Sequence, residues 1–225
     1  MKTIFAFLSL VTLQFVYSQR IHSERINTGF NKNGSIELKA PTKGELEGSM
    51  YIYEEFSAIK AGGELQVFLG RYNAFKDKME FKDKDKIYEY YPSVGDKDIL
   101  IINLNKTYVY VNYYIDDKKD ENGYLVKLQS GDNVVLYKKE KIKFKEGRVS
   151  QTGYDKTVPD KYIKANDVFY IKVNDGNIVK LPNSKKEFAK MFGEKEKDIL
   201  KFIKDNSYSL NEEAHINQIL FFINK

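Results

Sequence analysis

Acidic side chains stand among aromatic residues in two segments of this chain. Glu54 and Glu55 follow Tyr53, and Glu89 lies between two tyrosines. Two carboxylates about 5 to 10 Å apart can hydrolyse a glycosidic bond, one as the acid and the other as the nucleophile or base. Glutamate alternating with tyrosine is equally typical of a half-exposed strand. A carboxylate-dependent, glycan-directed hydrolase is therefore an alternative function, and the sequence assigns no catalytic residue.

Positive charge is concentrated in residues 138–145, which read Lys-Lys-Glu-Lys-Ile-Lys-Phe-Lys. If this run is one strand, Lys139, Lys141, Lys143 and Lys145 share a face. Such a face could meet phosphate, lipid headgroups or an acidic partner. A lysine-guarded edge strand, which resists aggregation, would have the same sequence. Both interpretations remain open.

Residues 107–115 form the clearest predicted strand. Positions 109, 111, 113 and 115 (Val, Val, Tyr and Ile) would share an apolar face that suits a core. Tyr108, Tyr110, Asn112 and Tyr114 would share the other face. Aromatic rings that carry hydroxyl groups suit a half-wet surface or a second layer.

Arg71 leaves a predicted strand and could contact a ligand. It could equally pair with Asp77 or Glu80 in a structural role. The side chains that we predict for a binding surface are thus strand lysines, tyrosines and this arginine. They are Tyr108, Tyr110, Tyr114, Lys139, Lys141, Lys143 and Arg71.

Metal and cofactor motifs are missing from the sequence. Cysteine is absent, and His22 and His215 are the two histidines, too few for a three-histidine metal site. The acidic pair Asp83 and Asp85 flanks a lysine, which would repel a bound cation. We expect no catalytic, cofactor or metal site.

The first residues predict export. Residues 1–18 have a lysine, an apolar stretch and then Val16-Tyr17-Ser18, the layout of a signal peptide cleaved near Ser18. No later apolar run approaches the length of a membrane span. The predicted product is a soluble, periplasmic or secreted protein. Its export and its net charge of +5 argue against nucleic-acid binding.

The remaining 200 or so residues suffice for a sizeable core, and they divide by pattern. Residues 19–47 are polar and predict a loosely ordered lead-in, residues 48–182 a β-rich domain, and residues 183–225 a helical section. The predicted fold is α+β: an antiparallel sheet (a meander, sandwich or open barrel) with about three short helices packed on it. The expected strands span 50–56, 64–72, 78–82, 86–91, 98–103, 107–115, 123–129, 133–144, 167–173 and 177–181.

The helical section begins after Pro182. Ser184 and Glu187 form a predicted capping box, and Gly193 is a natural stop. A second helix should cover residues 194–205. Ser209 and Glu212 predict a capping box for a third helix, whose apolar residues are Ile216, Ile219, Leu220 and Ile223.

The most distinctive local string is residues 70–75, Gly-Arg-Tyr-Asn-Ala-Phe, followed by Asp77, Met79, Glu80 and Phe81. Together with residues 135–139, 183–188, 198–206 and 223–224, this string resembles a family of uncharacterised exported proteins of Gram-negative bacteria. The family carries an RYNAxxDxME-like signature. The resemblance implies an exported, β-rich protein with a helical C-terminus. It implies no activity and transfers no functional residue.

These features together favour an exported, non-enzymatic protein of the cell envelope. We expect it to bind another macromolecule, a protein or a glycan of the envelope, or to have a structural role. The alternatives are the hydrolase and a binder of anionic surfaces that uses the lysine-rich strand. The ligand and the oligomeric state are not predicted.

Overall fold

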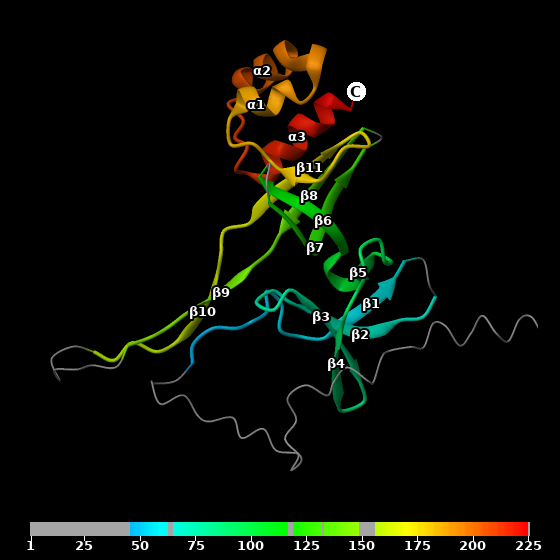
Figure 1. Ribbon diagram of the computed structural model, residues 1–225, viewed down its shortest axis with the longest axis vertical. Helices are drawn as coiled ribbons and strands as arrows, with labels where there is room; N and C mark the ends of the chain where they lie inside the picture. Colours follow the sequence, from blue (N-terminus) through cyan, green and yellow to red (C-terminus); the bar gives the residue numbers. More distant parts are fainter. Residues whose placement is uncertain (1–45, 63–64, 117–118, 132, 149–155, 225) are drawn as a thin grey trace, which may run out of the picture. The chain divides into compact units, whose positions relative to one another are not determined.

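The computed structural model describes residues 46–62, 65–116, 119–131, 133–148 and 156–224 (Figure 1). All of them belong to one unit, residues 43–225. The predicted signal peptide and nearly all of the predicted lead-in lie outside the described residues. Strands predominate, with three short α-helices at the C-terminal end, so the α+β prediction is confirmed.

The strands are short except for two. They are β1 (Ser57–Ala61), β2 (Phe68–Asn73), β3 (Lys78–Asp83), β4 (Lys86–Tyr90), β5 (Ile99–Ile101), β6 (Lys106–Asp116), β7 (Lys119–Ser130), β8 (Val134–Lys139), β9 (Ile142–Lys145), β10 (Lys161–Lys164), β11 (Val168–Val173) and β12 (Val179–Lys180). Strands β9 and β10 form a separate two-stranded ribbon. The other ten form one sheet in the order β12-β11-β8-β7-β6-β5-β1-β2-β3-β4.

One end of this sheet closes on itself. Val179 of β12 pairs in parallel with Tyr114 of β6, and the Tyr114 amide donates to the Ile178 carbonyl at 2.8 Å. Strands β6, β7, β8, β11 and β12 therefore form a closed five-stranded barrel. The barrel is closed rather than open. Because β6 also pairs with β5, it belongs both to the barrel and to an open sheet of β5, β1, β2, β3 and β4.

The two faces of β6 serve different cores, as its alternation predicts. Val109 and Tyr113 point into the barrel interior with Leu125 of β7. Tyr108, on the opposite face, packs with Tyr72 of β2 in a second core under the open sheet. The predicted core face is confirmed. The tyrosine face forms a second layer where the open sheet covers it.

Three helices cover the outer face of β8 and β11. They are α1 (Lys185–Lys190), α2 (Glu196–Asp205) and α3 (Glu213–Ile223), which appear orange to red in Figure 1. Their apolar residues form a third core with Leu136 and Ile171 from the barrel exterior; the fully buried helical members are Phe188, Ala189, Ile199, Ile203, Ile216, Ile219 and Leu220. Ser184 caps α1, where its Oγ accepts from the Glu187 amide at 3.4 Å.

Four expectations differ from the structure. The predicted strand 133–144 breaks after Lys139, because Glu140 turns into the protein interior. Residues 50–56 form a bridge and bends rather than a strand, and strands β1 and β10 were not expected. The second capping box does not form, because the Ser209 Oγ accepts from the Asn211 amide instead, and Glu212 precedes α3 without a side-chain cap.

Candidate functional site

The β9–β10 ribbon carries the exposed part of the basic run. Its register places Phe144 opposite Tyr162 and Lys145 opposite Lys161. Ile142 is 4% exposed and belongs to the core under the open sheet, and its amide donates to the Ala74 carbonyl at 3.1 Å. The ribbon is thus tied to the β2–β3 turn at its base.

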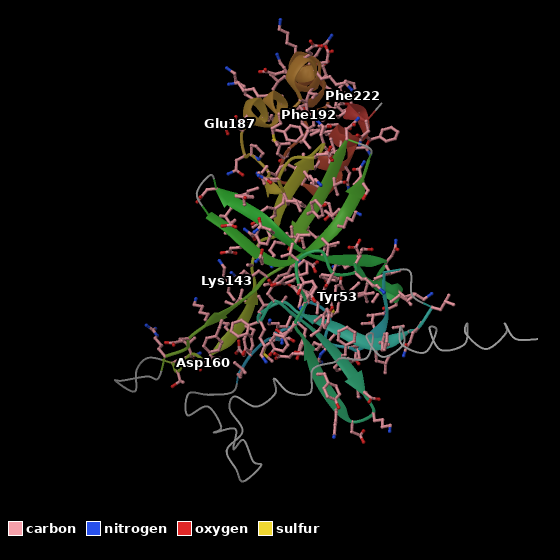
Figure 2. The ribbon with its side chains drawn as sticks, turned by 45° about the vertical axis from the view of Figure 1, so that its right-hand side comes forward. Tyr53, Lys143, Asp160, Glu187, Phe192 and Phe222 are labelled. Atoms are coloured by element: carbon pink, nitrogen blue, oxygen red, sulfur yellow. The ribbon has the colours of Figure 1, made fainter. Side chains whose placement is uncertain are left out.

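One face of the ribbon is basic. Lys143 and Lys145 alternate along β9, Lys141 directly precedes the strand, and all three are exposed. The two-residue period of an extended chain places them on the same side. Lys161 of β10 joins them, since it lies opposite Lys145. We call these four residues the lysine face; Figure 2 labels Lys143 on the ribbon.

The positive charge of the lysine face is largely unbalanced by acidic side chains. Within the part of the chain that the structure describes, Lys141, Lys143 and Lys145 form no ion pair. Lys161 lies 3.4 Å from Glu47, and the two side chains are 34% and 56% exposed. An exposed pair of this kind is worth little, so the face keeps its positive potential.

The opposite face of the ribbon is aromatic. The Phe144 ring packs edge-on against Tyr162 at 5.4 Å between centroids, and Tyr162 packs against Phe75 at 5.0 Å. Aromatic pairs of this geometry add packing energy beyond their buried area. These contacts fix which side of the ribbon carries the lysines.

Lys139 does not belong to the lysine face, contrary to the prediction. Its side chain is 12% exposed, and its Nζ lies 2.7 Å from the Asp77 Oδ2 and 3.0 Å from the Tyr124 carbonyl. Burial lowers the pKa of Lys139, and the Asp77 carboxylate opposes that change. The Tyr72 hydroxyl donates to the same carboxylate at 2.6 Å. The residue is a structural anchor.

Glu140, next along the chain, is a second anchor. It is 3% exposed; its Oε1 lies 2.6 Å from the Lys106 Nζ, and its Oε2 accepts from the Tyr108 hydroxyl at 2.7 Å. Burial and the Glu140 carboxylate raise the pKa of Tyr108 well above its usual range. Tyr108 is 1% exposed. It cannot be part of a binding surface, which corrects that prediction.

The other predicted tyrosines are half-buried. Tyr110 packs edge-on against Tyr124 at 5.1 Å, and Tyr114 lies where β6 meets β12. No contact among the described residues joins either one to the lysine face. The structure therefore does not bring Tyr110 and Tyr114 together with Lys141 and Lys143.

Arg71 has structural partners. Its Nε lies 3.0 Å from the Glu80 carboxylate, and its guanidinium stacks on the rings of Tyr51 and Phe56 at 3.7 and 4.2 Å. Asn73 donates to the same carboxylate at 2.8 Å. Of the two expected partners, Glu80 is the one that Arg71 contacts. Little of its side chain, 17%, is left for a ligand.

The acids of the hydrolase alternative lie in different settings. Glu89 contacts Lys76 at 2.6 Å, and this hydrogen bond lowers the pKa of Glu89, whereas a catalytic acid needs a raised pKa. Glu54 and Glu55 are exposed. Glu55 lines a cavity of about 10 Å³ beside Arg71 and Tyr108, which has room for about one water molecule.

A larger groove of about 840 Å³ lies between the start of β11 and the segment before α3. Lys138 lies 2.8 Å from Glu213 and 3.8 Å from Asp167, the two acids among the described residues that line the groove. Three asparagines also line it, at positions 166, 183 and 211. The groove is polar and carries both signs of charge.

Metal binding finds no support among the described residues, which contain no cluster of three or more potential ligands. The His215 Nδ1 accepts from the Ser209 amide at 3.3 Å and lies 3.3 Å from the Glu212 carboxylate. This histidine therefore has a structural role, in which it holds the loop between α2 and α3 against the start of α3. His22 lies outside the described residues. Of the helices that the structure describes, none has the length and apolarity needed to cross a bilayer.

The chain matches no protein-family model, no characterised protein and no solved structure. The resemblance inferred from the residue 70–81 string therefore stays a prediction. Sequence reasoning missed Lys161, which completes the lysine face. The available signal was the segment Lys161-Tyr162-Ile163-Lys164, whose β-prone middle residues indicate a short strand.

Proposed function

We propose that this protein is a non-enzymatic binding protein that attaches to an anionic macromolecular surface through the lysine face of the β9–β10 ribbon. The observation that supports this proposal is the set of Lys141, Lys143 and Lys145, exposed on one side without an acidic partner among the described residues. We also propose, from the sequence of residues 1–18, that it acts outside the cytoplasm.

Strand geometry supports the choice of ligand. Alternate residues of a strand lie about 7 Å apart along one face, so the lysines form an evenly spaced row of cations. Lys145 and Lys161 lie directly opposite each other, and like charges in that position destabilise a strand pair. A bound row of phosphates or carboxylates would remove this repulsion. The shared chemistry of the ligand is therefore a dense array of anionic groups, on a lipid surface or along a polyanionic chain.

The experiment compares two triple variants of equal charge. One carries Lys141→Gln, Lys143→Gln and Lys145→Gln; the control carries Lys185→Gln, Lys186→Gln and Lys190→Gln on α1, all three exposed. Each is tested for co-sedimentation with phosphatidylglycerol-containing vesicles and for retention on immobilised heparin. We expect binding by the wild type that weakens as salt rises, persists in the control and falls at least tenfold in the ribbon variant.

The two probes separate the two sources of anions. Binding to vesicles alone indicates a lipid surface, and binding to heparin alone indicates a polyanionic chain. Equal loss in both triple variants would show that net charge, not the ribbon, attracts the ligand. That result, or no binding of the wild type to either probe, would overturn the proposal.

A further inference from the structure

Strand β4 is the single free edge of the ten-stranded sheet among the described residues. At the other end of the strand order, β12 pairs with β6 and closes the barrel. β4 pairs with β3 on one side, and no described strand pairs with it on the other. Figure 1 shows β4 at the margin of the open sheet.

The turn before β4 determines which backbone groups are free. Residues 84 and 85 form a two-residue turn, so Asp83 and Lys86 are a hydrogen-bonded pair. Alternation in an antiparallel ladder then directs the N–H and C=O groups of Ile87 and Glu89 away from β3. An unpaired row of this kind is a template for another strand.

Exposed apolar side chains accompany these backbone groups. Ile87 is 52% exposed, Tyr90 37% and Tyr91 58%. Lys86 precedes them and Pro92 follows, so the edge that another strand could reach is only about five residues long. This length favours a partner strand that is equally short.

We propose that β4 pairs antiparallel with β4 of a second copy of this chain about a two-fold axis, which extends the sheet from one copy into the other. Equivalent strands meet in this way at an isologous interface. The pairing goes beyond the proposed function and does not depend on the lysine face.

Among the registers centred on the three interior residues of β4, charge selects one. In an antiparallel pair, the residue numbers of any two facing residues add up to the same sum, and this sum defines the register. Facing side chains must lie on the same face of the sheet, so the sum must be even. A sum of 174 places Asp85 opposite the second copy's Glu89, and a sum of 178 places Glu89 opposite its own equivalent; both juxtapose like charges. A sum of 176 avoids this clash.

The selected register also uses the free backbone groups. It makes Ile87 and the second copy's Glu89 a hydrogen-bonded pair, and the symmetry repeats that pair. Tyr88 then lies opposite its own equivalent on the two-fold axis. Lys86 faces the second copy's Tyr90, a cation and an aromatic ring that attract each other.

The first test measures oligomeric state by sedimentation equilibrium of protein purified after expression of the full chain. Ile87→Pro removes the outward N–H without breaking a bond to β3, because proline is tolerated where the N–H of an edge strand faces solvent. Ile87→Val keeps that N–H and serves as the matched control. We expect a dimer for the wild type and for Ile87→Val, with dimer affinity at least tenfold weaker for Ile87→Pro.

The second test uses the absence of cysteine from the chain. In the proposed register the two Tyr88 Cα atoms lie about 4.5 Å apart, within the range that a disulfide spans. With oxidised glutathione as the electron acceptor, Tyr88→Cys should therefore form a disulfide-linked dimer rapidly. Leu69→Cys, on the interior strand β2 and 48% exposed, should crosslink at least tenfold more slowly.

A wild-type monomer at all concentrations would overturn the proposal and leave β4 for a peptide of another protein. A dimer that Ile87→Pro does not weaken would place the interface elsewhere. Equal crosslinking rates for Tyr88→Cys and Leu69→Cys would contradict the register. Tyr88→Cys leaves the backbone of β4 intact, so it decides the question even if Ile87→Pro fails to fold.

Discussion

The Lys139 ammonium group lies 2.7 Å from the Asp77 carboxylate and joins the last residue of β8 to the turn between β2 and β3. The partners are 62 residues apart in the sequence. Asp77 has a positive φ of 56°, so the turn that presents its carboxylate needs a left-handed residue. This contact joins the barrel to the open sheet at the same turn to which the β9–β10 ribbon is bonded through Ile142.

Replacing Lys139 with Met should destabilise the fold. The variant keeps the aliphatic stem but leaves the Asp77 carboxylate without its cation, although Tyr72 still donates to it. We expect the free energy of unfolding to fall by about 1–3 kcal/mol, as measured by urea denaturation. The control is Lys141→Met, an exposed lysine of the same run, which should stay within about 0.5 kcal/mol of wild type. Equal effects of the two variants would contradict the anchoring role of Lys139.

Gly123→Ala should disturb the same contact from β7. A Cβ at this position would collide with the Asp77 Oδ2 and lie 2.9 Å from the Lys139 Nζ. The ion pair would have to open, so we expect a loss of about 1–3 kcal/mol. Combining Gly123→Ala with Lys139→Met in a double-mutant cycle should give less than the sum of the single losses. Additive losses would mean that the glycine is needed for another reason.

Ile219→Ala should show that the helices contribute to the stability of the whole unit. Ile219 is fully buried in the core that α3 shares with β8 and β11. A cavity at such a site costs about 2–5 kcal/mol. Gln218→Ala changes an exposed neighbour on the same helix and should have little effect on the midpoint of unfolding. A separate early transition that involves the helices alone would contradict a shared core.

The buried tyrosines should make the fold sensitive to alkali. Burial raises the pKa of Tyr170 from 10.0 to about 12. The unfolded chain releases this proton at the lower pH, so raising the pH favours unfolding. The stabilisation is fully present below about pH 10 and is lost as the pH rises from 10 to about 12. Stability measured across this range should fall less steeply for Tyr170→Phe than for wild type; identical slopes would contradict the assignment.

The elements that sequence reasoning predicted well are those that local pattern determines. The alternation of residues 107–115 predicted both faces of β6, and Ser184 with Glu187 predicted the start of α1. The run 138–145 alternates just as regularly, yet its strand breaks at Glu140. The cause is distant: Lys106 and Tyr108, more than 30 residues earlier, hold the Glu140 carboxylate in the interior.

The sequence predicted only part of the candidate site, again because contacts with distant residues leave no local pattern. Lys141 and Lys143 are exposed as expected, whereas Lys139 is buried because Asp77 lies beside it in the fold. Closure of the barrel was equally hidden from the sequence. It depends on β12, a strand of two residues, and on its parallel pairing with Tyr114, which no local pattern signals.

The closure of the barrel at β6 limits how the main sheet can associate. An open sheet presents two margins and can add copies without end, as amyloid does. Here one edge of the described sheet is already paired within the chain, because β12 pairs with β6. Pairing of β4 with a second copy would therefore occupy the remaining edge. The architecture thus permits a pair and, through this sheet, blocks fibre growth.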